Sequence, residues 1–232
     1  PRIQFLRTYN SSEDLKAKTG RFRKFVVGEE DVTDIIGKPY GVAMHDGKIM
    51  ACDTDQDNVA VFDIKDNVFS RMGGTHPGKL KKPINIFVDN DGHRYVADAG
   101  HKRIMIYDED GKYLRAVGDP EKMGPTDVVV FSNSIYVCDI DNGEVVILDK
   151  VTGEEKKRLG GKGEGKDKFF FPTNLAVDGD ANLFVTDTGN GRVVRFDSRG
   201  NYVGQVGELG RGPGQFARPK GIAVDQKGLL YA

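Results

Sequence analysis

One pattern recurs along the chain. A proline opens a short apolar run, a second apolar run ends in aspartate, and so does a third. In the fourth copy these runs are Pro172–Asp178, Leu183–Asp187 and Arg192–Asp197. Repetition with a period of about 45 residues indicates a repeat architecture. The copies begin at Pro39, Pro83, Pro125, Pro172 and Pro219, which are 44, 42, 47 and 47 residues apart.

Each complete copy contains four short runs rich in Val, Ile, Leu and aromatic residues, separated by Gly, Asp and Asn, which is typical of strands joined by turns. Asp91-Gly92 and Asp110-Gly111 suit tight hairpins because glycine adopts positive φ. Four antiparallel strands at this period match one blade of a β-propeller. A parallel β-helix has much shorter coils, and the chain lacks the 3.6-residue apolar period of an α-solenoid. We therefore predict an all-β propeller of four-stranded antiparallel blades, of the six-bladed type.

The length of the chain is short for this fold. Six blades need roughly 270 residues at this period, whereas the chain has 232. The fifth copy stops at Tyr231-Ala232, one residue before its second-strand aspartate is expected, so we expect a chain truncated in that repeat.

We treat residues 1–232 as a single propeller domain, in which residues 1–38 form an N-terminal strand or partial blade. The run at 21–28 resembles the last strand of a blade. Ser11–Leu15 has the composition of a capped short helix, and Ile3–Tyr9 is a candidate strand that closes the ring.

The repeats resemble NHL repeats. The similarity is carried by Phe171–Asp178, by Leu183–Asp197 and by Phe216–Asp225, which opens the next copy. The resemblance covers about residues 39–232 and implies a six-bladed propeller. The opening segments at 2–6 and 12–15 also resemble bacterial exported NHL proteins. This resemblance implies an extracytoplasmic location, in the periplasm or at the cell surface, and is compatible with an upstream lipid anchor.

Composition excludes several classes of protein. The formal net charge is −1, with 34 Lys and Arg against 35 Asp and Glu, which weakens a nucleic-acid assignment. No apolar run is long enough for a membrane helix, and no signal peptide is visible. The two cysteines, Cys52 and Cys138, occupy the same repeat position two blades apart, so we expect free buried thiols.

An aspartate ends the second strand of every complete copy. A ring of carboxylates could bind cations, but a residue that every blade carries is better explained as structural, because Asp accepts hydrogen bonds from turn amides. We also expect it to pair with an arginine five residues later, which the first and third copies lack. The predicted structural set is Asp53, Asp98, Asp139 and Asp187, with Arg103 and Arg192.

Antiparallel geometry places the loops between second and third strands at the same end of the ring as the loops between blades. We call this end the loop face. Loops on a rigid scaffold are the usual place for binding. The inter-blade loops expected there are 74–82, 119–124, 161–171 and 208–218. The candidate binding residues are Asp55, Asp57, His76, Lys79, Lys81, Lys82, His101, Lys102, Asp141, Asn142, Lys162, Lys166, Asn190 and Arg211.

No catalytic or metal-binding motif emerges from the sequence. The four histidines show no metal-ligand spacing. The run from Asp53 to Asp57 begins like a calcium loop but lacks the later glycine and glutamate. We predict no catalytic residue, no metal and no cofactor, and a non-catalytic scaffold that binds protein partners. Two alternatives remain: a metal-dependent lyase or lactonase-like hydrolase with an axial site, and RNA or polyanion binding.

Overall fold

The short apolar runs form strands, and each complete repeat forms one sheet. The computed structural model describes residues 7–15, 34–225 and 227–232 and contains four four-stranded antiparallel sheets, each with its strands in sequence order. Neighbouring strands pair because turns of a few residues join them. The predicted all-β, four-stranded blade is confirmed.

The strand bounds follow the repeats. The first blade contains β1 (Pro39–His45), β2 (Lys48–Asp53), β3 (Asn58–Asp63) and β4 (Val68–Met72). The second contains β5 (Pro83–Val88), β6 (Arg94–Asp98), β7 (Arg103–Tyr107) and β8 (Tyr113–Val117). The third contains β9 (Pro125–Phe131), β10 (Ser134–Asp139), β11 (Glu144–Asp149) and β12 (Glu155–Gly160). The fourth contains β13 (Pro172–Val177), β14 (Leu183–Asp187), β15 (Arg192–Phe196) and β16 (Tyr202–Val206), and the fifth copy contributes the pair β17 (Ala223–Val224) and β18 (Leu230–Tyr231).

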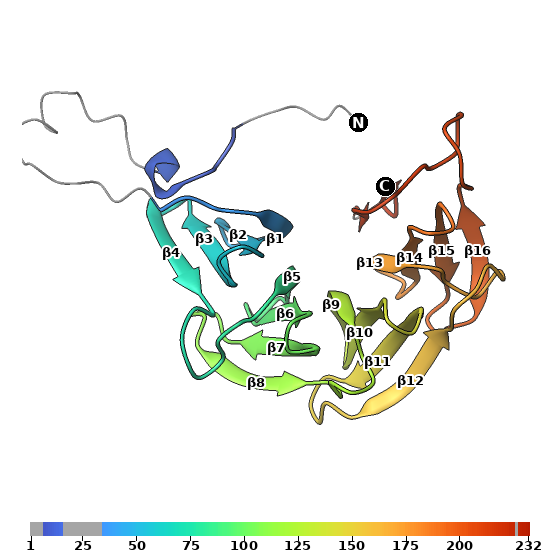
Figure 1. Cartoon of the computed structure of the whole chain (residues 1–232), viewed down its shortest axis with the longest axis horizontal. Helices are drawn as coiled ribbons and strands as arrows, with labels where there is room; N and C mark the ends of the chain where they lie inside the picture. Colours follow the sequence, from blue (N-terminus) through green and yellow to red (C-terminus); the bar gives the residue numbers. More distant parts are fainter. Residues whose placement is uncertain (1–6, 16–33, 226) are drawn as a thin grey trace, which may run out of the picture.

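The blades follow one another around an axis, as Figure 1 shows. The first strands β1, β5, β9 and β13 lie innermost, and the fourth strands β4, β8, β12 and β16 lie at the rim. The innermost strands of successive blades contact one another. The first strands therefore line the axis, and one residue position of the repeat recurs around it.

The core lies between adjacent blades rather than inside any one of them. Val96 of β6 and Val137 of β10 are fully buried because both faces of each middle strand are covered. Ile104 and Val117 of the second blade pack with Val146 of the third, and equivalent clusters join the other pairs of described blades. Each blade therefore buries its apolar faces against its neighbours, as expected for repeats that cannot fold alone.

The N-terminal segment packs on the first blade. Ser12–Leu15 forms a short 3-10 helix, η1, and Leu15 packs with Ala60 and Phe62. Residues 7–9 are not in a strand, so that part of the predicted closing strand is absent; residues 3–6 and 21–28 lie outside the described residues. Among the described residues, the structure has no helix with the length and apolar character needed to cross a membrane.

A repeated contact holds each inter-blade loop. At the end of the fourth strand a glycine with positive φ lies against an apolar side chain from the loop that follows. Gly160 has φ +103°, and a Cβ there would lie 2.5 Å from the ring of Phe169, which is fully buried. The same contact pairs Gly73 with Leu80, Gly118 with Met123 and Gly207 with Phe216.

We expect Gly160→Ala to lower the free energy of unfolding by about 2 kcal/mol or more, because it adds both an unfavourable φ and a clash with Phe169. Gly179→Ala is the matched control, since a Cβ at Gly179 meets no atom within 4 Å, and its effect should stay below about 0.5 kcal/mol. Chemical denaturation of both variants measures the difference. Equal effects would show that the glycine contact does not hold the loop.

Candidate functional site

The four recurrent carboxylates hold two loops together. Asp53, Asp98, Asp139 and Asp187 are all fully buried. Asp98 accepts hydrogen bonds from the backbone N–H groups of Lys81 and Lys82, in the preceding inter-blade loop, at 2.8 and 3.0 Å. It also accepts one from Gly100, in the following turn, at 2.9 Å. One carboxylate therefore binds two segments of the loop face to each other.

The other blades repeat this arrangement. Asp53 accepts from Gly37 and Lys38 in one segment and from Asp55 in the other, at 2.8 to 3.1 Å. Burial opposes ionisation of Asp53, but its backbone N–H donors outweigh burial and hold its pKa below the usual range. The repeated carboxylates are thus hydrogen-bonded within the scaffold. Asp139 accepts from the backbone of Gly124 and Asp141, and Asp187 from the backbone of Phe170 and the side-chain amide of Asn190.

The predicted arginine pair forms in the fourth blade but not in the second. Arg192 Nε lies 3.2 Å from Asp187 Oδ2, and the arginine is buried. Arg103 is exposed and forms no ion pair with Asp98 in the described structure, so that expectation is wrong. His101 takes the position instead, because its Nδ1 lies 2.9 Å from Asp98 Oδ2.

In the two blades whose third strand lacks the motif arginine, an arginine of the fourth strand lies beside the carboxylate instead. The spacing of the motif did not predict these arginines. Arg71 of β4 lies 3.5 Å from Asp53 and donates to Asn58 Oδ1 at 2.6 Å. Arg158 of β12 stands in the same relation to the third blade's carboxylate, at 3.5 Å from Asp139, and lies 2.9 Å from Glu144. Asn58 and Glu144 occupy the position of the missing arginine.

In the fourth blade the roles are reversed. Arg192 is on the third strand, and its Nη1 donates to Oε1 of Gln205 on the fourth strand at 2.8 Å. The arginine and its polar partner have therefore exchanged strands between blades. The motif spacing predicts an arginine on the third strand but not one on the fourth strand. The strand registers show that Arg71 and Gln205 hold the same position, because Ala60 pairs with Arg71 and Val194 pairs with Gln205.

The candidate binding residues divide into two groups in the structure. Lys102 and Asp141 pair with each other at 2.9 Å between the second and third blades. Asn142 and Asn190 donate to the carboxylates of their own blades. No ion pair joins the remaining lysines and Arg211 to a described carboxylate. Asp57 and Asn190 are partly buried, and the exposed members of the predicted set are Asp55, His76, Lys79, Lys81, Lys82, His101, Lys102, Asp141, Asn142, Lys162, Lys166 and Arg211.

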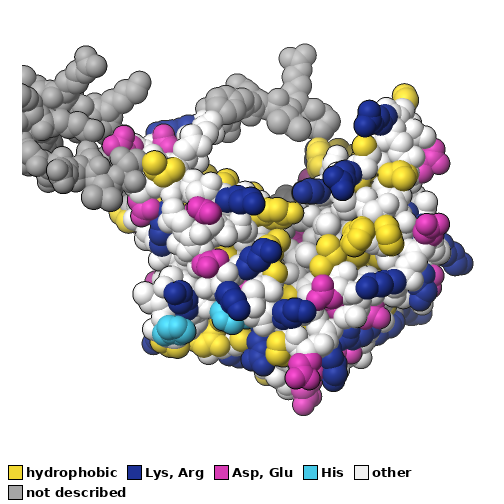
Figure 2. Space-filling view, viewed as in Figure 1, with side chains coloured by type: hydrophobic (Ala, Val, Ile, Leu, Met, Phe, Trp, Pro, Cys, Tyr) yellow, Lys and Arg dark blue, Asp and Glu magenta, His cyan; other side chains and the backbone are white. Residues whose placement is uncertain are grey.

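Lys and Arg predominate on the face that Figure 2 shows, with apolar side chains near its middle. Tyr40, Phe170 and Phe171 are half exposed, at 52, 51 and 50%. The rings of Phe170 and Phe171 lie 4.6 Å apart, and Lys220 Nζ lies 5.6 Å from the ring centre of Tyr40. The proline that opens a blade is preceded by an exposed cation in three copies: Lys38, Lys82 and Arg218.

A cavity of about 300 Å³ lies among the first strands. The third residue of each first strand, or its equivalent in the fifth copy, lines it, and these residues differ from blade to blade. They are Gly41, Asn85, Asp127, Asn174 and Gly221. Asp127 is only 5% exposed. The axis therefore carries a single buried carboxylate flanked in register by two carboxamides.

Asp127 accepts hydrogen bonds from two backbone N–H groups. Its Oδ1 accepts from the N–H of Val128 and its Oδ2 from the N–H of Leu175 in the next blade, both at 2.8 Å. Burial raises the pKa of Asp127 to about 7, although these two N–H groups and the amides of Asn174 and Asn85 favour the ionised form. The described residues offer no ion-pair partner to Asp127. The only sequence signal was that Asp replaces Gly or Asn at this position.

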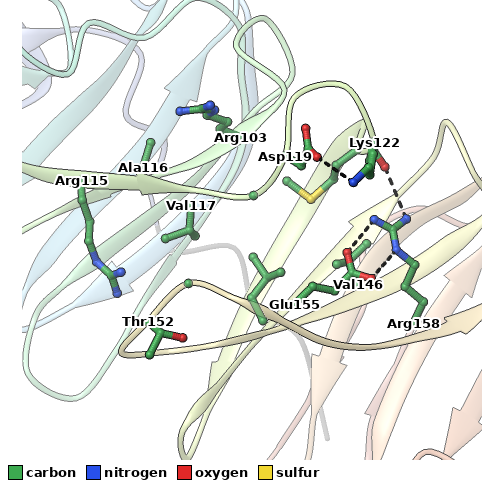
Figure 3. A pocket seen from close by; sticks show the side chains of 14 residues that line it. Arg103, Arg115, Ala116, Val117, Asp119, Lys122, Val146, Thr152, Glu155 and Arg158 are labelled. Atoms are coloured by element: carbon green, nitrogen blue, oxygen red, sulfur yellow. Dashed lines mark hydrogen bonds and ion pairs between the residues drawn. The ribbon is translucent and has the colours of Figure 1, made fainter.

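A groove of about 460 Å³ lies on the rim between the second and third blades (Figure 3). Arg158 pairs there with Glu155 at 2.9 Å, and Lys122 with Asp119 at 3.2 Å. Arg115, whose guanidinium donates to the carbonyl of Lys150, adds positive charge to the rim. Most of the charge in this groove is used in bonds within the protein.

One group of possible metal ligands occurs in the described part of the chain, at Asp89, Asp91 and His93. It lies in the turn between β5 and β6, at the end of the blades opposite the loop face. Lys150 Nζ lies 3.0 Å from Asp89 Oδ2, and the Tyr95 hydroxyl donates to the same oxygen at 3.1 Å. A protein cation therefore already neutralises the buried member of this group.

Comparison with known proteins agrees with the fold. A family model described as a 6-bladed beta-propeller matches residues 178–232. A probable peptidyl-alpha-hydroxyglycine alpha-amidating lyase of Caenorhabditis elegans is 28% identical over 58% of this chain and 41% of its own length. NHL repeat-containing protein 3 of Mus musculus is 26% identical over 61% of this chain and 45% of its own. The chain thus matches less than half the length of either relative.

Solved structures show the same architecture. A streptogramin B lyase superposes with a TM-score of 0.66 over 83% of this chain and 60% of its own, at 19% sequence identity. At this identity the likeness shows the fold alone.

Because the arginine and its polar partner can exchange strands, a second substitution should restore the stability lost by the first. Arg71→Gln should lower the free energy of unfolding by about 2 kcal/mol, because Asp53 loses its cationic partner. Adding Asn58→Arg should restore most of the loss, since the pair then copies Arg192 and Gln205. Thermal and denaturant unfolding measure both steps. A double variant no more stable than Arg71→Gln would show that the two arrangements are not equivalent.

The raised pKa of Asp127 predicts a pH dependence of stability. A carboxyl whose pKa is higher in the folded than in the unfolded chain stabilises the fold below its unfolded pKa, and this contribution is lost as pH rises through 7. The stability of the protein relative to Asp127→Asn should therefore fall by about 3 kcal/mol between roughly pH 4 and 8. Denaturation of both proteins across this range measures it, and a flat difference would contradict the assignment.

Proposed function

Since the chain is a β-propeller built from NHL-type repeats, we propose that it is a non-catalytic binding module whose loop face receives an acidic segment of a partner protein. The observation that carries the proposal is the set of exposed cations and aromatic rings at the axial end of that face. Lys38, Lys82 and Arg218 have no ion-pair partner among the described residues. The half-exposed Tyr40 follows Lys38 by two residues, and the Phe170–Phe171 pair directly precedes the proline that opens the fourth blade.

The chemistry of this surface suits such a partner. Unpaired cations attract carboxylates over distances comparable to the Debye length, and half-exposed aromatic rings are frequent anchors in protein interfaces. The recurrent carboxylates support the proposal indirectly, because they hold the loops rigidly in place. A preorganised loop face loses less entropy on binding than a flexible one.

A protein partner fits better than a nucleic acid. Acidic side chains are interspersed among the cations, including Asp55, Glu164 and Asp167, all exposed. They would repel a phosphate backbone, whereas a protein segment can place its own cations against them. The extracytoplasmic location belongs to this proposal and rests on the resemblance to exported NHL proteins; fractionation of the native cells tests it.

A lyase or lactonase-like hydrolase with an axial site is the second candidate. Two of the similar proteins are named as lyases, and Asp127 is a carboxylate present in one blade only. Measurement of divalent metal in the purified protein tests the metal-dependent form of this candidate. About one tightly bound ion per chain, with turnover lost on its removal, would favour it over the binding module.

Charge reversal tests the binding module. A fluorescent peptide of alternating Glu and Tyr should bind, and Lys82→Glu with Arg218→Glu should weaken its binding at least about tenfold by replacing attraction with repulsion. Lys112→Glu with Lys227→Glu is the matched control, because both lysines are exposed in turns at the opposite end of the blades. Fluorescence anisotropy measures the affinities, and thermal unfolding checks that all variants fold.

Affinity should also fall as salt increases from about 50 to 300 mM. An equal loss in both double variants would contradict a site on the loop face. Tighter binding of a single-stranded oligouridine with the same sensitivity to Lys82 and Arg218 would identify a nucleic-acid surface and overturn the protein-partner proposal.

A further inference from the structure

A buried carboxyl group lines the axial cavity. Asp127 is 95% buried, lines the cavity, and has no ion-pair partner among the described residues. An uncompensated buried carboxylate is unfavourable by several kcal/mol, so such groups are usually paired or serve a site. The recurrent Asp53 and Asp187, by contrast, have arginine partners.

The other blades show that the fold does not require this charge. The equivalent residues are glycine in the first and fifth copies and asparagine in the second and fourth. Asn85 Oδ1 accepts the N–H of Ile86 at 3.1 Å, the same local contact that Asp127 makes with Val128 at 2.8 Å. A neutral side chain therefore makes the same local contact, and the carboxylate adds its charge and a bond to Leu175 of the next blade.

The donors around Asp127 are all neutral. Each of its oxygens accepts one backbone N–H group, and the carboxamides of Asn85 and Asn174 also favour its ionised form, but no described cation lies beside it. Asn85 and Asn174 add carboxamide oxygens at the same level on the neighbouring strands β5 and β13. Three oxygen-bearing side chains thus surround one end of the cavity, and Ile86, Val128 and Leu175 form apolar walls beside them.

We propose that this axial cavity binds the ammonium group of a small primary amine, with Asp127 supplying the counter-charge and the carboxamides of Asn85 and Asn174 turning their oxygens to the ligand to accept its remaining hydrogen bonds. The short apolar body of the amine packs on Ile86, Val128 and Leu175. This site is separate from the loop face and goes beyond the proposed function.

An ammonium fits these residues better than the other cations. It has three N–H donors for three oxygen-bearing side chains. Calcium takes six to eight oxygen ligands, commonly including several carboxylates, whereas the described lining of the cavity has a single carboxylate. Phe87, which also lines the cavity, offers an aromatic ring that attracts an organic cation. The volume of about 300 Å³ suits a small ligand.

Calorimetric titration of the full chain at about pH 8, where Asp127 is ionised, tests the proposal. The probes are n-butylammonium chloride and the neutral n-butanol, with calcium, magnesium and zinc chlorides as separate titrations. We expect the amine to bind at least about tenfold more tightly than the alcohol, because only the amine supplies a positive charge. Binding of a metal but not of the amine would overturn the proposal, as would binding of neither.

Two variants locate the site. Asp127→Asn should lose at least about tenfold in amine affinity, whereas Asp66→Asn, exposed in the turn between β3 and β4 at the end opposite the loop face, should retain it. Asn174→Leu leaves the carboxylate and its backbone donors in place and should weaken binding severalfold, so the proposal stays testable if Asp127→Asn does not fold. Unchanged amine affinity in either folded axial variant would contradict the site. Binding of the acidic peptide should be unaffected in all three variants, which separates this test from that of the loop face.

Discussion

A buried carboxylate that bridges two loops is the interaction on which this propeller depends. At the end of each complete blade's second strand an aspartate, fully excluded from solvent, accepts hydrogen bonds from the loop that enters the blade and from the turn that follows. The bonds are charge-assisted and lie in a low-dielectric interior, where each is stronger than a neutral hydrogen bond at the surface. They fix where every first strand begins, and therefore which residues line the axis.

The repeat provides its own comparison between structural and functional residues. A side chain found in every blade, such as Asp98 or Asp139, serves the blade. A side chain found in one blade at a position where the others have neutral residues, such as Asp127, is the better candidate for a role specific to that blade. The arginine partners refine this rule, because Arg71 and Arg192 perform the same task from different strands. The absence of a motif residue, such as the third-strand arginine, from one copy is therefore weak evidence for a specialised function of that blade.

Sequence reasoning predicted the blades well because their signals are local. The proline at Pro172, the apolar runs and the glycine turns each act within a few residues, and the observed strands begin and end within a residue or two of those expected. It failed where the partner is remote along the chain. Arg71 of β4 reaches Asp53 of β2 across the intervening strand β3, and His101 takes the place expected for Arg103; neither result follows from spacing.

The sequence by itself determined the repeat and the four-stranded blade, because these depend on turns and strand pairs between near neighbours in the chain, and it predicted a structural role for the recurrent aspartates. Only the tertiary structure decided which side chains meet at the axis. Asn85, Asp127 and Asn174 are more than 40 residues apart from one copy to the next, and they share a cavity only because the blades pack face to face around one axis and bring the same register position of each first strand together.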